Sequence, residues 1–471
     1  MEVLSRMLRA VPTTPGFSFH PKCCRVGLTH LIFADDLLVF TRGDYPSIKA
    51  IDRCLGLFAS YSGLCPNPAK TNIYFAGVRP DVRKLILLGT NYVEGTFPFK
   101  YLGVPLYSSR LTRSMFYALI EKIKSKIRHW SNNFLSYAGR IQLLNSVVFG
   151  MESFWCACFL LPQWIISDID KLCRQFLWGQ AEGQRRLIYF SWEEVCRPGV
   201  KGGFGIREVL SWNKALLVRI LWRLHTDHAS LWCEWARKYV LCRDSCWSFS
   251  AGGRTGLWRV LHQLRDELIG KLGSSDAVIH FLEGCCSSNK LRLGLVYSMF
   301  RGEHPNLYWA KTLLDPIIVP RHAVVVKLAV QNGLPTVDNL NKHGLFLVNR
   351  CILCKAALES CLHVFYDCCF SAAVIRQLFC WLGIARRPRG LKYELRRMAK
   401  ARRNGWRDKW ARCTLAAGVY FIWQERNFRI FHGTERTVDR LVFLVKYNVA
   451  IRLYANVSEN VLQDVVDSML S

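Results

Sequence analysis

Two adjacent carboxylates, Asp35 and Asp36, lie between two short apolar runs, and this pattern constrains the fold more than any other in the chain. The flanking runs, Leu31-Ile32 and Leu37-Leu38-Val39-Phe40, are of a length and composition that predict buried strands. The pair would then lie at the turn of a β-hairpin. Carboxylates on such a turn suit hard cations such as Mg²⁺, which bind oxygen ligands. Asp is also a common turn residue, so these positions alone leave both a metal site and a solvated turn open.

The segment from Thr29 to Phe40, preceded by His20-Pro21-Lys22-Cys23, resembles the catalytic segment of reverse transcriptases. The resemblance is to those of LINE-type (non-LTR) retrotransposons common in plants. Further stretches fit the same family in the same order. They are Ser62-Gly63-Leu64, Asn67 and Lys70-Thr71 of the palm, the Tyr101-Leu102-Gly103 hairpin within Phe97 to Leu106, and Leu135 to Arg140 and Phe176 to Gly179 of the thumb. The resemblance extends over most of the chain and implies an RNA-directed DNA polymerase.

This resemblance implies roles for three palm residues. Asp35 would bind a catalytic metal ion, Asp36 would have a weaker, positional role, and Lys70 would lie near the incoming phosphates. Polymerases hold two metal ions about 4 Å apart, and bridging both takes a carboxylate from a second strand. In the family that strand lies upstream, whereas residues 1–34 contain one acidic side chain, Glu2. We therefore expect a truncated, C-terminal fragment that is inactive alone or needs a missing N-terminal polymerase part, and that binds Mg²⁺ only if its palm is completed.

The charge balance predicts a polyanionic partner. The chain has 64 Lys and Arg against 35 Asp and Glu, a formal net charge of +29, and a field of this sign favours RNA or DNA. Sixteen Trp and 17 Tyr interleaved with these cations support the same partner, because bases stack on aromatic faces. A generic basic protein, or one attracted to anionic lipid, is the alternative.

The sequence predicts neither secretion nor a membrane partner. The stretch from Met1 to Arg6 starts acidic and lacks the apolar core of a signal peptide. The most apolar windows, residues 147–162 and 414–423, are interrupted by Glu152 or are too short to span a bilayer. Twenty cysteines without a secretory signal indicate a reducing compartment, with thiols or metal ligands in place of disulfides. We expect a nuclear or cytoplasmic protein.

Cys351, Cys354, His363 and Cys368 have a spacing that zinc can use. With 20 cysteines present, a Cys-x-x-Cys pair alone means little, but the downstream His and Cys complete a tetrahedral set. The flanking residues are similar to the reverse-transcriptase zinc-binding domain of plant LINE proteins, whose four ligand positions are all filled here. Four protein ligands leave no open position for catalysis, so the zinc would be structural.

The overall pattern predicts an α+β, mostly helical fold in five parts. These are a partial palm (1–108), a helical thumb (109–180), a Trp-rich helical connector (181–285), the zinc-binding domain (286–385) and a basic helical C-terminal region (386–471). Nothing in the chain offers the separated acidic set of a ribonuclease H, so we expect that domain to be absent.

Two basic stretches are candidates for nucleic-acid contact. The first lies in the expected thumb, and the second follows the zinc-binding domain. Their candidate residues are Lys122, Lys126, Arg128, Arg396, Arg397, Arg402, Arg403 and Trp406. For the first stretch the alternative is a solvated face, and for the second a nuclear-import signal or a membrane-surface helix. The alternative function for the whole chain is a zinc-dependent RNA- or DNA-binding module without catalysis.

Overall fold

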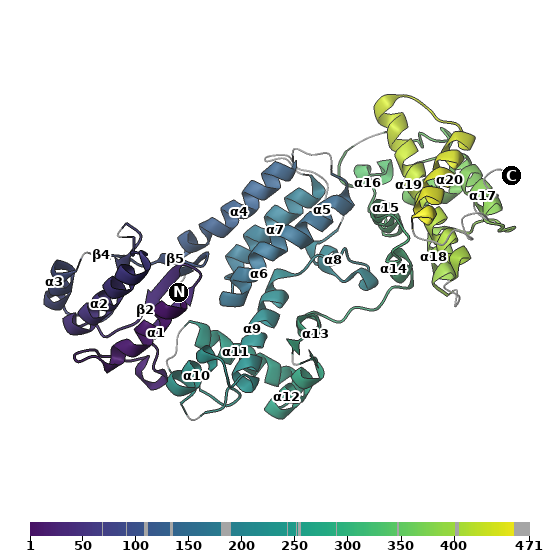
Figure 1. Cartoon of the computed structure of the whole chain (residues 1–471). Coiled ribbons are helices and arrows are strands. Elements are labelled where there is room, and N and C mark those ends of the chain that lie inside the picture. Colours follow the sequence, from purple (N-terminus) through teal and green to yellow (C-terminus); the bar gives the residue numbers. More distant parts are fainter. Residues whose placement is uncertain are drawn as a thin grey trace. The chain divides into compact units, whose positions relative to one another are not determined.

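The computed structural model describes residues 1–67, 69–90, 92–107, 112–131, 135–179, 190–242, 244–250, 252, 256–288, 290–345, 348–400 and 405–455. Within these residues helices predominate and the strands form four two-stranded sheets, which confirms the expected α+β, mostly helical class (Figure 1). None of the described helices combines the length and apolarity that crossing a bilayer requires.

Backbone contacts divide the chain into two units. The first comprises Met1–Ala118, Trp155–Leu160 and Asn213–Phe300, and the second Leu119–Phe154, Leu161–Trp212 and the chain from Arg301 onward. The division falls within α4 (Arg113–Ser131), α6 (Phe149–Cys158) and α9 (Val209–Thr226). The five-part division stays a prediction.

The first unit contains short strands followed by helices. Its elements are α1 (Glu2–Ala10), β1 (His30–Phe33), β2 (Asp36–Val39), α2 (Tyr45–Ser62), β3 (Asn72–Ile73), α3 (Pro80–Gly89), β4 (Val93–Glu94), β5 (Phe99–Tyr101), β6 (Val104–Leu106), α10 (Leu231–Ala236), α11 (Leu257–Leu272), α12 (Ser275–Gly284), β7 (Cys286–Ser287), β8 (Lys290–Leu291) and α13 (Leu293–Phe300). In the Trp-rich segment, α9 to α13 contribute to a core that includes Trp222, Trp247 and Phe249.

Helix α2 forms where Ile48, Ile51, Leu55 and Phe58, spaced three or four residues apart, predict a helix. The Asp44 side chain accepts a hydrogen bond from the Ser47 N–H, which caps the first turn. Gly63 ends the helix with a φ of 70°, a left-handed conformation that glycine adopts without steric cost. The buried face includes Ile51 and Phe58, which pack with apolar residues of α1.

The segment around the two carboxylates forms the expected β-hairpin. Strands β1 and β2 are antiparallel, and Phe33 pairs with Asp36, so Ala34 and Asp35 form the turn. Ala34 has a φ of 52°, in the left-handed region that costs a residue with a Cβ about 1–2 kcal/mol. The second expected hairpin, β5 and β6, has Leu102 and Gly103 at its turn.

The expectation that strands β1 and β2 are buried is wrong. Leu37 and Val39 pack against the core of α1 and α2, but Leu31 and Phe33 are 38% and 59% exposed. Successive side chains of a strand point to opposite faces, so a two-stranded sheet with a helical core on one face leaves its other residues uncovered. The apolar runs therefore predicted the two strands correctly. Whether a strand is buried depends on which other elements of the fold cover it.

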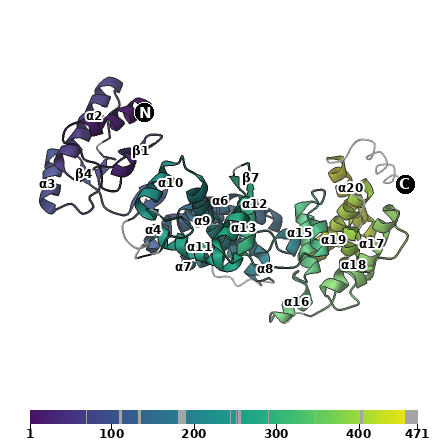
Figure 2. The ribbon, with the colours of Figure 1, turned by 90° about the horizontal axis from the view of Figure 1, so that it is seen from below.

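In its described residues the second unit is helical apart from its loops. Besides its parts of α4, α6 and α9, it contains α5 (Tyr137–Leu143), α7 (Gln163–Trp178), α8 (Trp192–Cys196), α14 (Tyr308–Leu313), α15 (Pro320–Val330), α16 (Val337–Lys342), α17 (Cys369–Trp381), α18 (Leu391–Lys400), α19 (Trp406–His432) and α20 (Val438–Tyr454). Helix α19 packs against α15, α17 and α20, and these helices lie together in both views (Figures 1 and 2).

Two carboxylates of this unit have raised pKa values. Glu152, on α6, is fully buried and both of its carboxylate oxygens lack a hydrogen-bond partner. Burial raises the pKa of Glu152 well above its usual value, and the charge of Asp170 on α7 raises it further. Burial likewise raises the pKa of Asp170 to about 6.

Candidate metal centre

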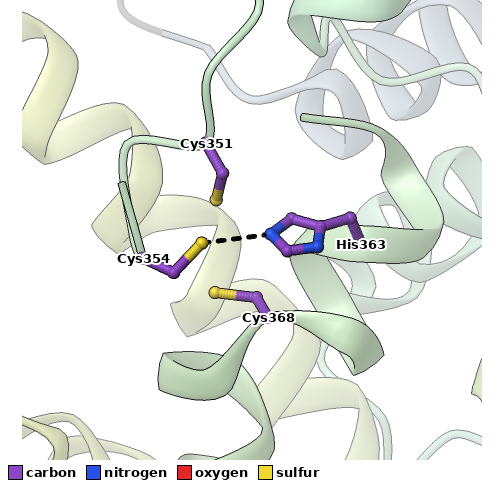
Figure 3. Close-up of side chains that lie close together, drawn as sticks. All are labelled: Cys351, Cys354, His363 and Cys368. Carbon is purple, nitrogen blue, oxygen red and sulfur yellow. Dashed lines mark hydrogen bonds between the residues drawn. The ribbon is translucent and has the colours of Figure 1, made fainter. Parts of the chain in front are cut away.

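Four side chains with metal-binding atoms converge in the second unit (Figure 3). The ligand atoms of Cys351, Cys354, His363 and Cys368 all lie within 4.8 Å of one another, and Cys354 Sγ is 3.3 Å from His363 Nε2. In a tetrahedral site with Zn–S bonds of about 2.3 Å, sulfur atoms are about 3.8 Å apart. Small inward movements would therefore bring the four atoms to the distances that zinc requires.

Local backbone structure positions the first two cysteines. The Cys351 N–H donates to Ala357 O, and the Lys355 N–H donates to Cys351 O, each at 2.8 Å. Lys355 closes this turn with a φ of 55°. The backbone N–H groups of Leu353 and Cys354 point back at Cys351 and donate to its sulfur. The loop thus presents two sulfur atoms while satisfying its own backbone groups.

Helix α17 positions the last cysteine. Cys368 is the N-cap residue of this helix, and the N–H groups of Phe370 and Ser371 donate to its sulfur. A hydrogen bond from the Cys351 thiol, together with these donors, lowers the pKa of Cys368 to about 5. The same bond raises the pKa of Cys351. Because the thiolate is the form that binds metal, these donors favour the metal-binding form of Cys368.

The donor set fits zinc. Three cysteine sulfurs and one imidazole are a combination found in closed, structural zinc sites. None of the four residues is a carboxylate, and together they would fill all four coordination positions of a tetrahedral zinc ion. When bound, zinc would hold the Cys351 loop, the His363 turn and the start of α17 together. Binding would also displace the thiol protons, so metal affinity should rise with pH.

Helix α19 supports the ligand loop through a buried ion pair. The Arg426 guanidinium donates to both carboxylate oxygens of Glu359, at 2.6 and 3.3 Å. Glu359 lies between Cys354 and His363, its carboxylate also accepts from the Val337 N–H, and its own N–H donates to Asn349 Oδ1. The pair therefore attaches the segment between the ligands to both α16 and α19.

A second arginine of α19 reaches the cysteine loop directly. Arg429 donates to Leu353 O at 3.3 Å, between the first two cysteines, and to Glu425 at 2.9 Å. It also contacts Glu435, which pairs with Lys355 at 2.6 Å. These contacts connect the end of α19 to the turn that carries Cys351 and Cys354.

Sequence reasoning missed this support. Glu359 and Arg426 are 67 residues apart, so no local pattern links them. The available signal in the sequence was that Glu425, Arg426 and Arg429 interrupt an apolar run. The structure shows that all three are buried on α19. Charged residues are almost never buried unless they are paired, so their position on the helix indicates partners elsewhere.

The predicted catalytic residues belong to the first unit, whereas this centre belongs to the second. Asp35 is exposed in the β1–β2 turn, and Asp36 is exposed as the first residue of β2. Lys70 is exposed in a turn where its N–H donates to Asn67 O. Among the hydrogen bonds and ion pairs of the described residues, none involves the side chains of these three. The Cys/His cluster is also the one group of three or more metal-binding side chains found in the described part of the chain. The catalytic roles stay predictions.

The structure places the first basic stretch on α4. Lys122, Lys126 and Arg128 lie on this helix, which buries Ile120 and Ile123. None of the three cations belongs to the buried core of the described residues. The helix is therefore amphipathic, as predicted. Whether its cations contact nucleic acid stays a prediction.

The second basic stretch forms two helices instead of one. Arg396 and Arg397 are exposed on α18, whereas Trp406 begins α19 and stacks on Trp410 at 5.6 Å. Trp410 is buried against Trp381, so it belongs to the core and not to an exposed aromatic edge. The other two predicted contacts, Arg402 and Arg403, lie outside the described residues.

Comparisons with known proteins support the zinc interpretation. The family model described as zinc-binding in reverse transcriptase matches residues 293–374, which include all four candidate ligands. The Cys/His cluster therefore lies in a region of the reverse-transcriptase zinc-binding type. A protein of Arabidopsis thaliana that is named as a putative ribonuclease H protein is 33% identical over 159 residues, which are 33% of this chain and 26% of that protein.

A second similar protein of Arabidopsis thaliana is named as an uncharacterized mitochondrial protein. It is 25% identical over 109 residues, which are 22% of this chain and 71% of that protein. The chain thus spans about a quarter of the first relative and 71% of the second.

Proposed function

We propose that this chain is a zinc-containing, nucleic-acid-binding part of a reverse transcriptase of the LINE (non-LTR) type. The observation that carries the proposal is the Cys351, Cys354, His363 and Cys368 cluster, within a stretch that matches the reverse-transcriptase zinc-binding model. The two hairpins and their order along the chain, and the net charge of +29, support the same function. We also propose that it acts in the nucleus or cytoplasm.

Zinc would have a structural role in this function. Its four ligands come from a loop, a helical turn and the start of α17, so the metal would close a segment that local hydrogen bonds only partly order. Binding free energy at such a site contributes directly to folding. The zinc-bound form would then hold the surrounding helices in a geometry that binds RNA or DNA.

Metal analysis of the purified 471-residue chain tests the zinc site. We expect about one equivalent of zinc, and Cys351→Ser should lose it because three ligands no longer close the tetrahedron. Cys380→Ser is the matched control, since this cysteine is exposed on α17 and is not one of the four candidate ligands. A wild-type content below about half an equivalent, or unchanged content in Cys351→Ser, contradicts the proposed site.

Binding to RNA tests the second half of the proposal. Fluorescence anisotropy with a labelled RNA of mixed sequence should show affinity that falls steeply with salt, because neutralised phosphates release counterions. Chelation of zinc should weaken this binding together with the loss of folded structure. A zinc-loaded chain that does not bind RNA or DNA at low salt contradicts the nucleic-acid function while leaving the metal site intact.

A further inference from the structure

We propose that the exposed face of α18, joined by Tyr308 of α14, is a surface for sequence-independent contact with a nucleic-acid backbone. This inference rests on the proposed nucleic-acid function and assigns it to a surface. Four cations are exposed on this helix, Lys392, Arg396, Arg397 and Lys400. None of the four forms an ion pair among the described residues.

The acidic residue of α18 does not offset these charges. Glu394 is buried, with 1% of its side chain exposed, and it binds the guanidinium of Arg386 and the N–H of Arg389. The packing partner α14 contributes an exposed lysine, Lys311, and no carboxylate. Asp315, just after α14, is held in a nearly buried pair with Arg412. The face therefore presents positive charge with its local carboxylates already neutralised.

Two tyrosine rings order the arginines of this surface. Arg396 lies over the Tyr308 ring at 5.6 Å, and Arg389 lies over the Tyr393 ring at the same distance. Both rings are still partly open to solvent, at 43% and 41%. A guanidinium held over a ring keeps its charge and donors free for a phosphate, while it loses less conformational freedom on binding.

The spacing of the cations suits a polyanion. Lys392, Arg396 and Lys400 are four residues apart, so they lie on one side of the helix over about 12 Å. One strand of a duplex carries a phosphate about every 3.4 Å along its axis, so this length matches about three or four phosphates. The exposed cations of this helix are lysines and arginines, which bind phosphate oxygens whatever the base sequence, so the face suits contact with the backbone.

A membrane surface fits this helix less well than nucleic acid does. A helix that lies in a bilayer interface must insert its apolar face between the lipids. The apolar face of α18 is already occupied, because Leu391 and Leu395 are buried and the helix packs against α14. The residues that the helix leaves exposed are its four cations, Tyr393 and Ala399.

The salt dependence of RNA and duplex DNA binding by the full chain tests this surface. In K392Q/R396Q/R397Q/K400Q the negative slope of log K against log salt should become less steep by about 2.8 to 3.6, because each of the four lost phosphate contacts removes about 0.7 to 0.9. The matched control is R9Q/R53Q/K84Q/R219Q, which removes four exposed cations from the first unit and lowers the net charge equally. Its slope should stay close to that of the wild type. Zinc content and circular dichroism confirm that both variants are folded.

Tyr308→Leu provides a second measurement, because it removes the ring beneath Arg396 without changing any charge. We expect severalfold weaker binding with an unchanged salt slope. Equal slopes in the α18 variant and the control, or an α18 variant that loses only its binding to anionic phosphatidylserine vesicles, would overturn the assignment. A wild-type chain that binds no nucleic acid would instead overturn the proposed function on which the assignment rests.

Discussion

Arg426→Met should destabilise the zinc-binding part of the chain far more than the loss of a surface ion pair would. The Arg426 and Glu359 side chains are 5% and 0% exposed, and the guanidinium binds both carboxylate oxygens. Methionine fills a similar volume but carries no charge. The Glu359 carboxylate would stay buried between two candidate ligands, with the Val337 N–H as a donor and no cation.

Removing one member of a buried ion pair typically costs about 3–5 kcal/mol. Because about 1.4 kcal/mol is a tenfold change, the folding equilibrium should shift by about two to three and a half orders of magnitude. The double variant Glu359→Gln with Arg426→Met should recover most of this loss. The neutral amide that replaces the carboxylate costs less to bury and still offers an oxygen to the Val337 N–H.

Urea unfolding of the zinc-loaded full chain, monitored by the release of zinc to a chromophoric chelator, measures the loss of stability in the zinc-binding part itself. Arg6→Met is the matched control, because it breaks an exposed pair with Glu2 and should cost less than about 1 kcal/mol. The reasoning is refuted if Arg426→Met and Arg6→Met release zinc at the same urea concentration. It is refuted equally by a double variant that is as unstable as the single one.

Asp170→Asn should flatten the pH dependence of stability between pH 3.8 and about 6. The folded protein keeps this proton up to about pH 6 while the unfolded chain releases it near 3.8, so ionisation of Asp170 alone costs the wild type roughly 3 kcal/mol of stability as the pH rises through this window. Equal slopes for both proteins in urea unfolding across that range would contradict this. Ala34→Gly should stabilise the β1–β2 hairpin by up to about 1 kcal/mol, since glycine adopts the positive φ freely. The measurement is hydrogen exchange of the backbone amides in β1 and β2, which should become slower. Primer extension by this chain with Mg²⁺ or Mn²⁺ should be undetectable, because Asp35 and Asp36 have no third carboxylate with them in the described part of the chain. Extension that Asp35→Asn abolishes would show that this expectation is wrong.

Local features of this fold could be predicted from the sequence. The four candidate zinc ligands lie within 18 consecutive residues, and the Asp-Asp hairpin is closed by a turn of two residues, so short-range spacing indicated both. The helix from Tyr45 to Ser62 likewise followed from the helical spacing of its apolar residues. In each case the interactions that decide the structure connect residues that are near in sequence.

The features that the sequence did not predict depended on contacts between distant segments. Arg426 reaches Glu359 across 67 residues, and Arg396 lies over Tyr308 across 88, and neither pairing has a signature within a short window. The exposure of Phe33 shows the same limit, because a strand's burial depends on which other elements cover it. The burial of Trp410 likewise depends on its contact with Trp381, which is 29 residues away.

The reach of α19 also bears on how this region can be cut or recombined. A polypeptide that ends at residue 385 would contain every candidate ligand and the whole of the family match, yet it would lack both arginines that hold the ligand loops from outside. Such a fragment would have the chemistry of a zinc site without the scaffold that orders it. We therefore expect the smallest fragment of this region that can fold in another protein to extend at least to the end of α19.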